Sequence, residues 1–134
     1  MDQPTPVSQF KSKSGLARIY AAFKNSMAGL LMAWRTEHAF RQELTLVVIG
    51  VIVALVLKIS VFEKLALIVV LIMVLIVELI NSAVEAVVDR VSLDRHPLSK
   101  NAKDFASAAV FFSLVLAGIT WAVILAQHFL KLWP

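Results

Sequence analysis

The stretch that decides the fold is residues 65–88, LALIVVLIMVLIVELINSAVEAVV. It is entirely apolar up to Val77 and then carries Glu78, Asn81 and Glu85. About 20 mostly apolar residues are enough for a helix to cross the hydrocarbon core of a bilayer. The stretch therefore predicts a membrane-spanning helix with ionisable groups in its second half.

Two further apolar runs, residues 44–62 and 105–128, predict two more spans, the first only if Lys58 extends its ammonium to the far interface. Of the 134 residues, 60% are hydrophobic and 16% are charged. A water-soluble domain of this size could not hide so much apolar surface, because small domains leave about a third or more of their chain surface exposed. The absence of cysteine excludes disulfides and thiolate metal sites. The predicted fold class is all-α and integral to a membrane.

An amphipathic helix is predicted over residues 15–35, before the first span. Its apolar residues recur at helical spacing, and the indole ring of Trp34 favours the level of the lipid headgroups. We interpret this segment as a helix lying on the membrane surface, although a helix packed on a soluble core would show the same period. Residues 1–14 are polar and contain two prolines, which predicts a mobile tail before a single domain over residues 15–134.

The distribution of Lys and Arg predicts the orientation. Six lie in residues 1–43 and four in residues 89–104, whereas two lie in the turn after the first span and one lies at the C-terminus. Cytoplasmic loops are the ones enriched in Lys and Arg. The N-terminus and the 89–104 loop are therefore predicted to face the cytoplasm, which brings Glu37 and Glu43 to the same interface as Glu85. The net charge of +4 fits a membrane surface better than nucleic acid, since the basic residues flank apolar runs.

Four polar residues of the second span share one helix face. At 100° per residue, Glu78, Asn81, Glu85 and Asp89 fall within a sector of about 80°. Such groups can simply hold helices together by hydrogen bonds. Two carboxylates on one face, however, repel each other unless a cation or a proton joins them. The pattern favours a site for metal binding and proton transfer.

Three segments together carry a family resemblance: AWRTEHAFRQE (33–43), ELINSAVEAVVDR (78–90) and HPLSKNAKDFASAAV (96–110). They resemble the prokaryotic diacylglycerol kinases, small integral-membrane lipid kinases whose family includes undecaprenol kinases. The chain contains no G-x-x-x-x-G-K-[ST] loop, in agreement with a kinase outside the P-loop class. The resemblance implies a homotrimer, with three spans and one surface helix per chain and with active sites at the cytoplasmic interface between neighbouring chains.

The resemblance also implies roles for individual residues. Glu78 is implied as the general base that takes the proton from the lipid hydroxyl, and Asn81 as the residue that fixes this carboxylate or the hydroxyl. Glu37 and Glu85 are implied as ligands of Mg²⁺, and Lys103 as the positive charge on the polyphosphate of ATP, with Asp104 to orient it or to meet the nucleotide. The implied nucleotide site comprises Arg18, Asn25, Glu37, Glu85, Asp94, Arg95, His96, Lys103 and Asp104. The implied lipid site comprises Ala39, Phe40, Arg41, Gln42, Glu43, Glu78, Ser107 and Trp121.

Three functions are compatible with these features. The first is ATP-dependent phosphorylation of diacylglycerol to phosphatidic acid at the bacterial inner membrane, and the second is the same reaction on a long polyprenol. The third is an ion or proton carrier that uses Glu78 and Glu85 as a relay. The Lys103-Asp104 pair and the basic loop favour a nucleotide, and Asn81-Ser82 with the two tryptophans at 34 and 121 favours diacylglycerol.

Overall fold

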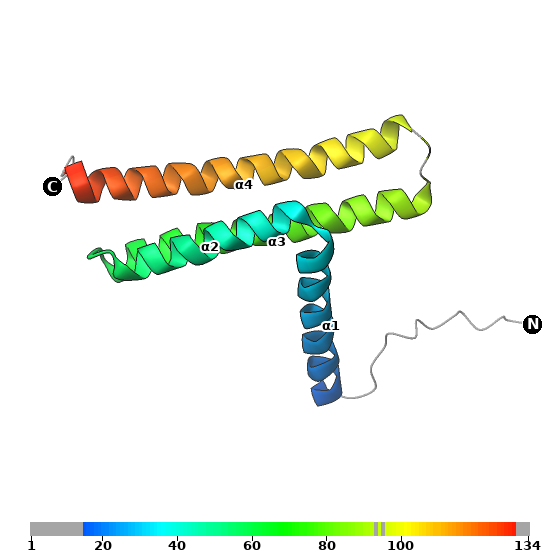
Figure 1. Ribbon diagram of the computed structural model, residues 1–134, viewed down its shortest axis with the longest axis horizontal. Coiled ribbons are helices and arrows are strands. Elements are labelled where there is room, and N and C mark those ends of the chain that lie inside the picture. The colour runs from blue at the N-terminus through cyan, green and yellow to red at the C-terminus, as the bar shows by residue number, and fades with distance from the viewer. Residues whose placement is uncertain (1–14, 93, 95, 131–134) are drawn as a thin grey trace, which may run out of the picture.

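A computed structural model describes residues 15–92, 94 and 96–130 of the chain. This part is all helical, and the predicted tail at residues 1–14 lies outside it. Helices α2, α3 and α4 run side by side, and α1 leaves the bundle sideways (Figure 1). The helices are α1 (Gly15–Thr36), α2 (His38–Val56), α3 (Val61–Val91) and α4 (Pro97–Leu130).

Helices α2, α3 and α4 are long and apolar enough to cross a membrane, in agreement with the prediction of three apolar helices. Helix α2 has 19 residues, or about 28 Å, close to the thickness of a hydrocarbon core. Helices α3 and α4, with 31 and 34 residues, reach about 46 and 51 Å. Their extra turns extend beyond the start of α2, at the end where the loop joins α3 to α4 (Figure 1).

The first span ends earlier than the predicted boundary at residue 62. Helix α2 stops at Val56, and a short turn leads into α3 at Val61. Ser60 starts α3 with a capping box: its hydroxyl accepts a hydrogen bond from the Glu63 amide at 3.2 Å, and its own amide donates to Glu63 Oε2 at 2.7 Å. The apolar pattern hid this break because apolar residues continue on both sides of the turn.

The connection between α3 and α4 is shorter than the predicted loop at residues 89–104. Helix α3 continues to Val91, and α4 begins at Pro97, eight positions before the predicted start of the third span at residue 105. Proline suits a first helical position because its missing amide hydrogen has no partner there, and the Leu98 amide donates to His96 Nδ1 at 3.2 Å. Consequently Lys103 lies on a helix and is held in a fixed register.

The α1–α2 junction is tied by one arginine. Glu37 is extended, with φ −98° and ψ 115°, and it separates the two helices. Arg41 Nη1 donates to the carbonyl oxygens of Trp34 at 2.9 Å and Arg35 at 3.3 Å. A cation that binds the last carbonyls of a helix satisfies groups that otherwise lack partners. Arg41, predicted in the lipid site, thus fixes the end of α1.

The best-packed part of the bundle lies toward the α2–α3 turn. Ala54, Leu67 and Ile124 form a buried apolar cluster with one residue from each long helix. Trp121 packs against this cluster, and its Nε1 donates to the carbonyl oxygen of Leu67 at 3.4 Å. This apolar cluster therefore joins all three long helices near the α2–α3 turn.

Candidate active site

Glu78 is the charged residue buried most deeply within the described part of the chain, with 4% of its surface exposed. It lies on α3, and the charges of Glu37 and Glu85 act on it. Its own charge acts on Glu43, which comes from the start of α2. The carboxylates of two sequence-distant segments therefore lie within electrostatic reach of one another.

Asn81 lies within this acidic cluster of Glu37, Glu43, Glu78 and Glu85. Its Nδ2 donates to Glu85 Oε1 at 3.4 Å, so in this structure the amide supports Glu85 and not the predicted partner Glu78. The other side-chain oxygen, Asn81 Oδ1, is buried without a hydrogen-bond partner in the described structure, as is Glu43 Oε2. Buried polar atoms normally have partners. The acidic cluster thus retains acceptor capacity for a proton donor or a cation.

The predicted metal ligands Glu37 and Glu85 both lie near Glu78. Within residues 15–92, 94 and 96–130, no three His, Asp or Glu side chains converge closely enough to hold a metal ion by themselves. Mg²⁺ in phosphoryl-transfer sites usually takes one or two carboxylates and completes its shell with phosphate oxygens and water. Glu37 and Glu85 offer only oxygen ligands, and their negative charges act on the carboxylate of Glu78. Such a donor set suits this kind of ion.

An open pocket of ≈ 650 Å³ lies between the C-terminal end of α3 and the N-terminal end of α4. Four of the residues predicted to bind nucleotide line it, and Arg95 lies outside the described residues. We call this space the α3–α4 pocket. Its lining consists of Val88, Asp89, Ser92, Asp94, His96, Pro97, Ser99, Lys100, Lys103 and Asp104.

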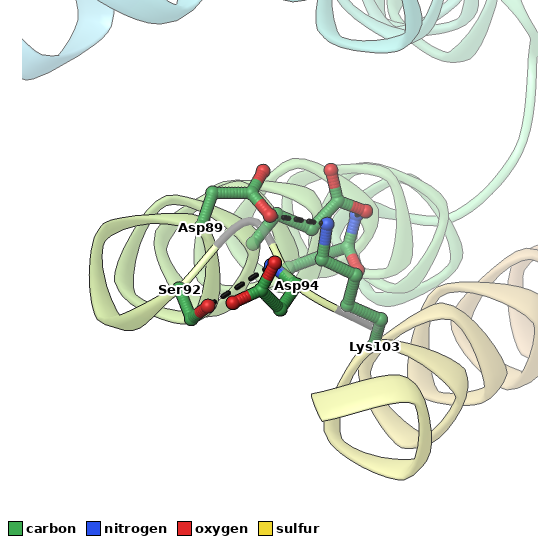
Figure 2. Close-up of polar contacts among 6 residues, drawn as sticks. Asp89, Ser92, Asp94 and Lys103 are labelled. Carbon is green, nitrogen blue, oxygen red and sulfur yellow. Dashed lines mark hydrogen bonds and ion pairs between the residues drawn. The ribbon is translucent and has the colours of Figure 1, made fainter. Parts of the chain in front are cut away.

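Two ion pairs lie at the rim of the α3–α4 pocket. Lys103 Nζ donates to Asp89 Oδ1 at 2.6 Å and joins α4 to α3 (Figure 2). Lys100 and Asp104 form a second pair one helical turn apart on α4. The charge of Glu85 also acts on Lys103. Lys103 at the pocket rim is therefore within electrostatic reach of Glu85, the acidic-cluster residue nearest in sequence to the end of α3.

A groove of ≈ 610 Å³ separates α1 from α3 and opens beside Glu37. Its α3 wall is formed by Leu79, Ser82, Ala83 and Ala86, whose mostly small side chains leave the space open. The Ser82 hydroxyl is buried without a hydrogen-bond partner in the described structure. This α1–α3 groove gives apolar access to the side of α3 that carries Ser82.

Several predicted site residues do not join these features. Arg18 and Asn25 are exposed on α1, and they line neither the α3–α4 pocket nor the α1–α3 groove. Ser107 is exposed on α4. Trp121 lies in the packed region around Leu67, about 16 Å along α3 from Glu78 at 1.5 Å per residue. One chain alone therefore does not assemble all the predicted contacts.

The predicted segment before Glu43 has mixed roles in the structure. Phe40 is buried in the core, with 2% of its surface exposed, and Gln42 is exposed. Ala39 is exposed as well, so only Glu43 of this segment lies within the acidic cluster. Conversely, sequence reasoning gave no role to Asp89 beyond its place on the polar face. The sequence feature that indicates a role for Asp89 is its position as the last residue of this polar face, where it contacts Lys103.

These features define a helical membrane protein that combines a buried acidic cluster with a lysine-bearing pocket at one end of its bundle. The sequence matches the family described as prokaryotic diacylglycerol kinase over residues 24–125. The chain belongs to this family.

Individual relatives cover nearly the whole chain. A diacylglycerol kinase of Pseudomonas aeruginosa is 54% identical over 118 residues, which are 88% of this chain and 96% of the relative. A diacylglycerol kinase of Escherichia coli strain K12 is 44% identical over 116 residues, 87% of this chain and 95% of the relative. One of Haemophilus influenzae is 41% identical over 112 residues, 84% and 95% of the two chains.

Proposed function

We propose that this protein transfers the γ-phosphoryl group of ATP to the hydroxyl of diacylglycerol and so produces phosphatidic acid. The observation that carries the proposal is the buried carboxylate of Glu78 on the helix whose end lines a lysine-bearing pocket, about 16 Å farther along its axis, in a chain whose relatives are diacylglycerol kinases. A lipid hydroxyl can approach Glu78 from the membrane, and a polyphosphate can approach Lys103 from water.

The reaction requires a base, an aligned acceptor and neutralisation of charge. Glu78 accepts the proton of the lipid hydroxyl while that oxygen forms a bond to the γ-phosphorus, and the bond from the γ-phosphorus to the ADP oxygen breaks. Asn81 supports Glu85 through its amide, with an acceptor oxygen left for the incoming hydroxyl or its water. General base catalysis contributes about 10²–10⁴-fold to rates of this kind.

Charge neutralisation on the polyphosphate falls to Lys103 and to a divalent cation. Glu37 and Glu85 would hold Mg²⁺, and the ion would supply positive charge to offset the negative charge of the polyphosphate. The position of Lys103 in the lining of the α3–α4 pocket, within electrostatic reach of Glu85, supports this role at the phosphates. His96 and Asp94 at the pocket wall are left for the nucleoside end.

The lengths of the helices support an interfacial site. Helix α2 alone matches the hydrocarbon thickness, so the extra turns of α3 and α4, with Asp89 and Lys103, extend into water. Glu43 lies five positions after the start of α2, about 8 Å along its axis. This depth suits a diacylglycerol hydroxyl just below the headgroups. Helix α1 leaves the bundle at the start of α2 (Figure 1), and we place it on the cytoplasmic surface of the inner membrane.

A homotrimer would complete the site. The three long helices leave most of their large apolar side chains exposed in one chain, and Arg18 and Asn25 lie away from the pocket. Packing in membranes favours small side chains, which bring helices close together. Ala108 and Ala109 of α4 are exposed and supply such a surface. A neighbouring chain could then bring its α1 residues to the nucleotide.

The experiment that tests the function offers purified protein diacylglycerol or undecaprenol, each with radiolabelled ATP and Mg²⁺ in mixed micelles. The expected result is label in phosphatidic acid, with kcat/KM at least tenfold higher for diacylglycerol. Preference for the polyprenol, or label in neither lipid, would overturn the proposal. A parallel proton-flux assay in vesicles without ATP tests the carrier alternative, for which we expect no flux above that of protein-free vesicles.

A further inference from the structure

We propose that Asp89 is a positioning residue: it holds the ammonium of Lys103 at the rim of the α3–α4 pocket, ready for the phosphates of the nucleotide. This inference rests on the proposed kinase function. It concerns a residue of α3 that touches Lys103 and lines the same pocket. Figure 2 shows the two side chains meeting across the gap between their helices.

The geometry leaves Lys103 able to bind a second anion. Its Nζ donates to Asp89 Oδ1 at 2.6 Å, which uses one of the three hydrogens of the ammonium group. Two donors remain for phosphate oxygens. Because the contact comes from α3 and the lysine from α4, the pair fixes the ammonium relative to the helix that carries Glu78 and Glu85.

The neighbouring aspartate does not provide this contact. Asp104 directly follows Lys103 in sequence, but it pairs with Lys100 one turn earlier on the same helix. Adjacent helical residues point in different directions, about 100° apart around the axis. Asp89 therefore determines where the flexible lysine side chain rests before the nucleotide arrives.

Asp89 also weakens the binding of the nucleotide while it positions the lysine. The negative charge of Asp89, hydrogen-bonded to the ammonium of Lys103, partly cancels the attraction of this ammonium for phosphate. Removal of that negative charge should leave nucleotide binding intact or strengthen it, while the lysine loses its fixed position. Misplacement of a catalytic group by about 1 Å can lower the rate by as much as 10²-fold. A positioning role thus predicts that kcat and KM respond differently.

A purely structural role predicts another pattern. The pair could serve only to connect α3 and α4, but both side chains are partly accessible to water, 38% for Lys103 and 51% for Asp89. Ion pairs so exposed to water add little to stability, because solvent screens them. If the ion pair nonetheless served only to hold α3 and α4 together, its loss would lower thermal stability and reduce kcat without any gain in nucleotide affinity.

The test compares Asp89→Asn and Asp89→Glu with the parent enzyme in mixed micelles, under saturating diacylglycerol and varied MgATP. We expect Asp89→Asn to lower kcat at least tenfold with an unchanged or lower KM for MgATP, and Asp89→Glu to recover at least a third of the parent kcat. In the Lys103→Gln background, Asp89→Asn should change kcat less than twofold, since the group it positions is gone. The matched control is Lys64→Gln, which removes a lysine that joins α3 to the Leu55 carbonyl oxygen at the opposite end.

Lys64→Gln should lower the thermal midpoint without changing kcat or KM more than twofold. The inference is overturned if Asp89→Asn leaves kcat within twofold of the parent, if KM rises in step with the fall in kcat, or if the losses at Asp89 and Lys103 simply multiply. A parent enzyme that transfers no label to any lipid would instead refute the proposed function. Nucleotide affinity, measured with a fluorescent ATP analogue, would then still report on the effect of Asp89 on phosphate binding.

Discussion

The two ends of the helical bundle are built differently. At the α2–α3 turn, Ser60 and Glu63 cap each other, and Lys64 Nζ donates to the Leu55 carbonyl oxygen at 2.9 Å. At the other end, Glu43 and Asn81 keep buried oxygen atoms without partners in the described structure. The first end satisfies its polar groups and so gains stability. The second end keeps like charges close together, an arrangement that costs stability and leaves groups free for chemistry.

The largest effect is expected from Glu78→Gln, which keeps the size of the side chain but removes its ability to accept a proton. Turnover should fall by about 10²–10⁴-fold, the usual contribution of a general base. Stability should be unchanged or higher, because the negative charges of Glu37 and Glu85 no longer oppose a third carboxylate. Lipid kinase assays combined with unfolding in SDS measure both quantities. Turnover within about tenfold of the parent would remove Glu78 from the role of base.

A smaller effect at the same end is expected from Glu37→Gln and Glu85→Gln. Each should raise the Mg²⁺ concentration at half-maximal rate by about tenfold, equivalent to a loss of about 1.4 kcal/mol in binding. The double variant should lose less than the product of the two single losses, since two ligands of one ion are not independent. The measurement is a Mg²⁺ titration of the rate for all four proteins. Multiplicative losses would argue against a shared ion.

The matched change at the stable end is Ser60→Ala. Loss of an N-cap hydroxyl costs about 1 kcal/mol, so the free energy of unfolding in SDS should fall by this amount. The kcat and KM of the folded protein should stay within twofold of the parent, because the capping box lies at the start of α3, whereas Asp89, with its partner Lys103, lies near the end of that helix. A clear loss of activity at unchanged stability would mean that the two ends are coupled and would weaken the comparison.

Much of this division of labour is present in the sequence. The 3.6-residue period places Glu78, Asn81 and Glu85 on one face, and the hydrogen bond from Asn81 to Glu85 together with the charge of Glu85 on Glu78 confirms that placement. Local periodicity is sufficient for features that depend on one helix alone.

Features that depend on contacts between two helices are harder to predict from the sequence. The ion pair between Asp89 and Lys103 joins residues 14 positions apart, and its partner choice depends on how long each helix is. Hydropathy locates only the apolar part of a helix, so it does not reveal the two turns of α4 that precede residue 105. The turn before Val61 could have been found, since Ser60 and Glu63 have the spacing of a capping box. The number of chains in the assembly stays a prediction.

The smallest effect on activity is expected from changes in α1, which belongs to neither end of the bundle. Its residues Phe23 and Lys24 are adjacent and both exposed. If α1 lies on the membrane, Phe23→Asp places a charge in the lipid and should lower activity at every salt concentration. Lys24→Asp should mainly weaken attraction to anionic lipid, by about 1 kcal/mol per basic residue.

Kinase assays in vesicles with anionic lipid, at low and high salt, separate the two variants. At high salt the Debye length falls to about 3 Å, so the deficit of Lys24→Asp should fade while that of Phe23→Asp persists. Equal deficits that do not respond to salt would mean that α1 packs within the protein, and both residues would then act through contacts with a neighbouring chain.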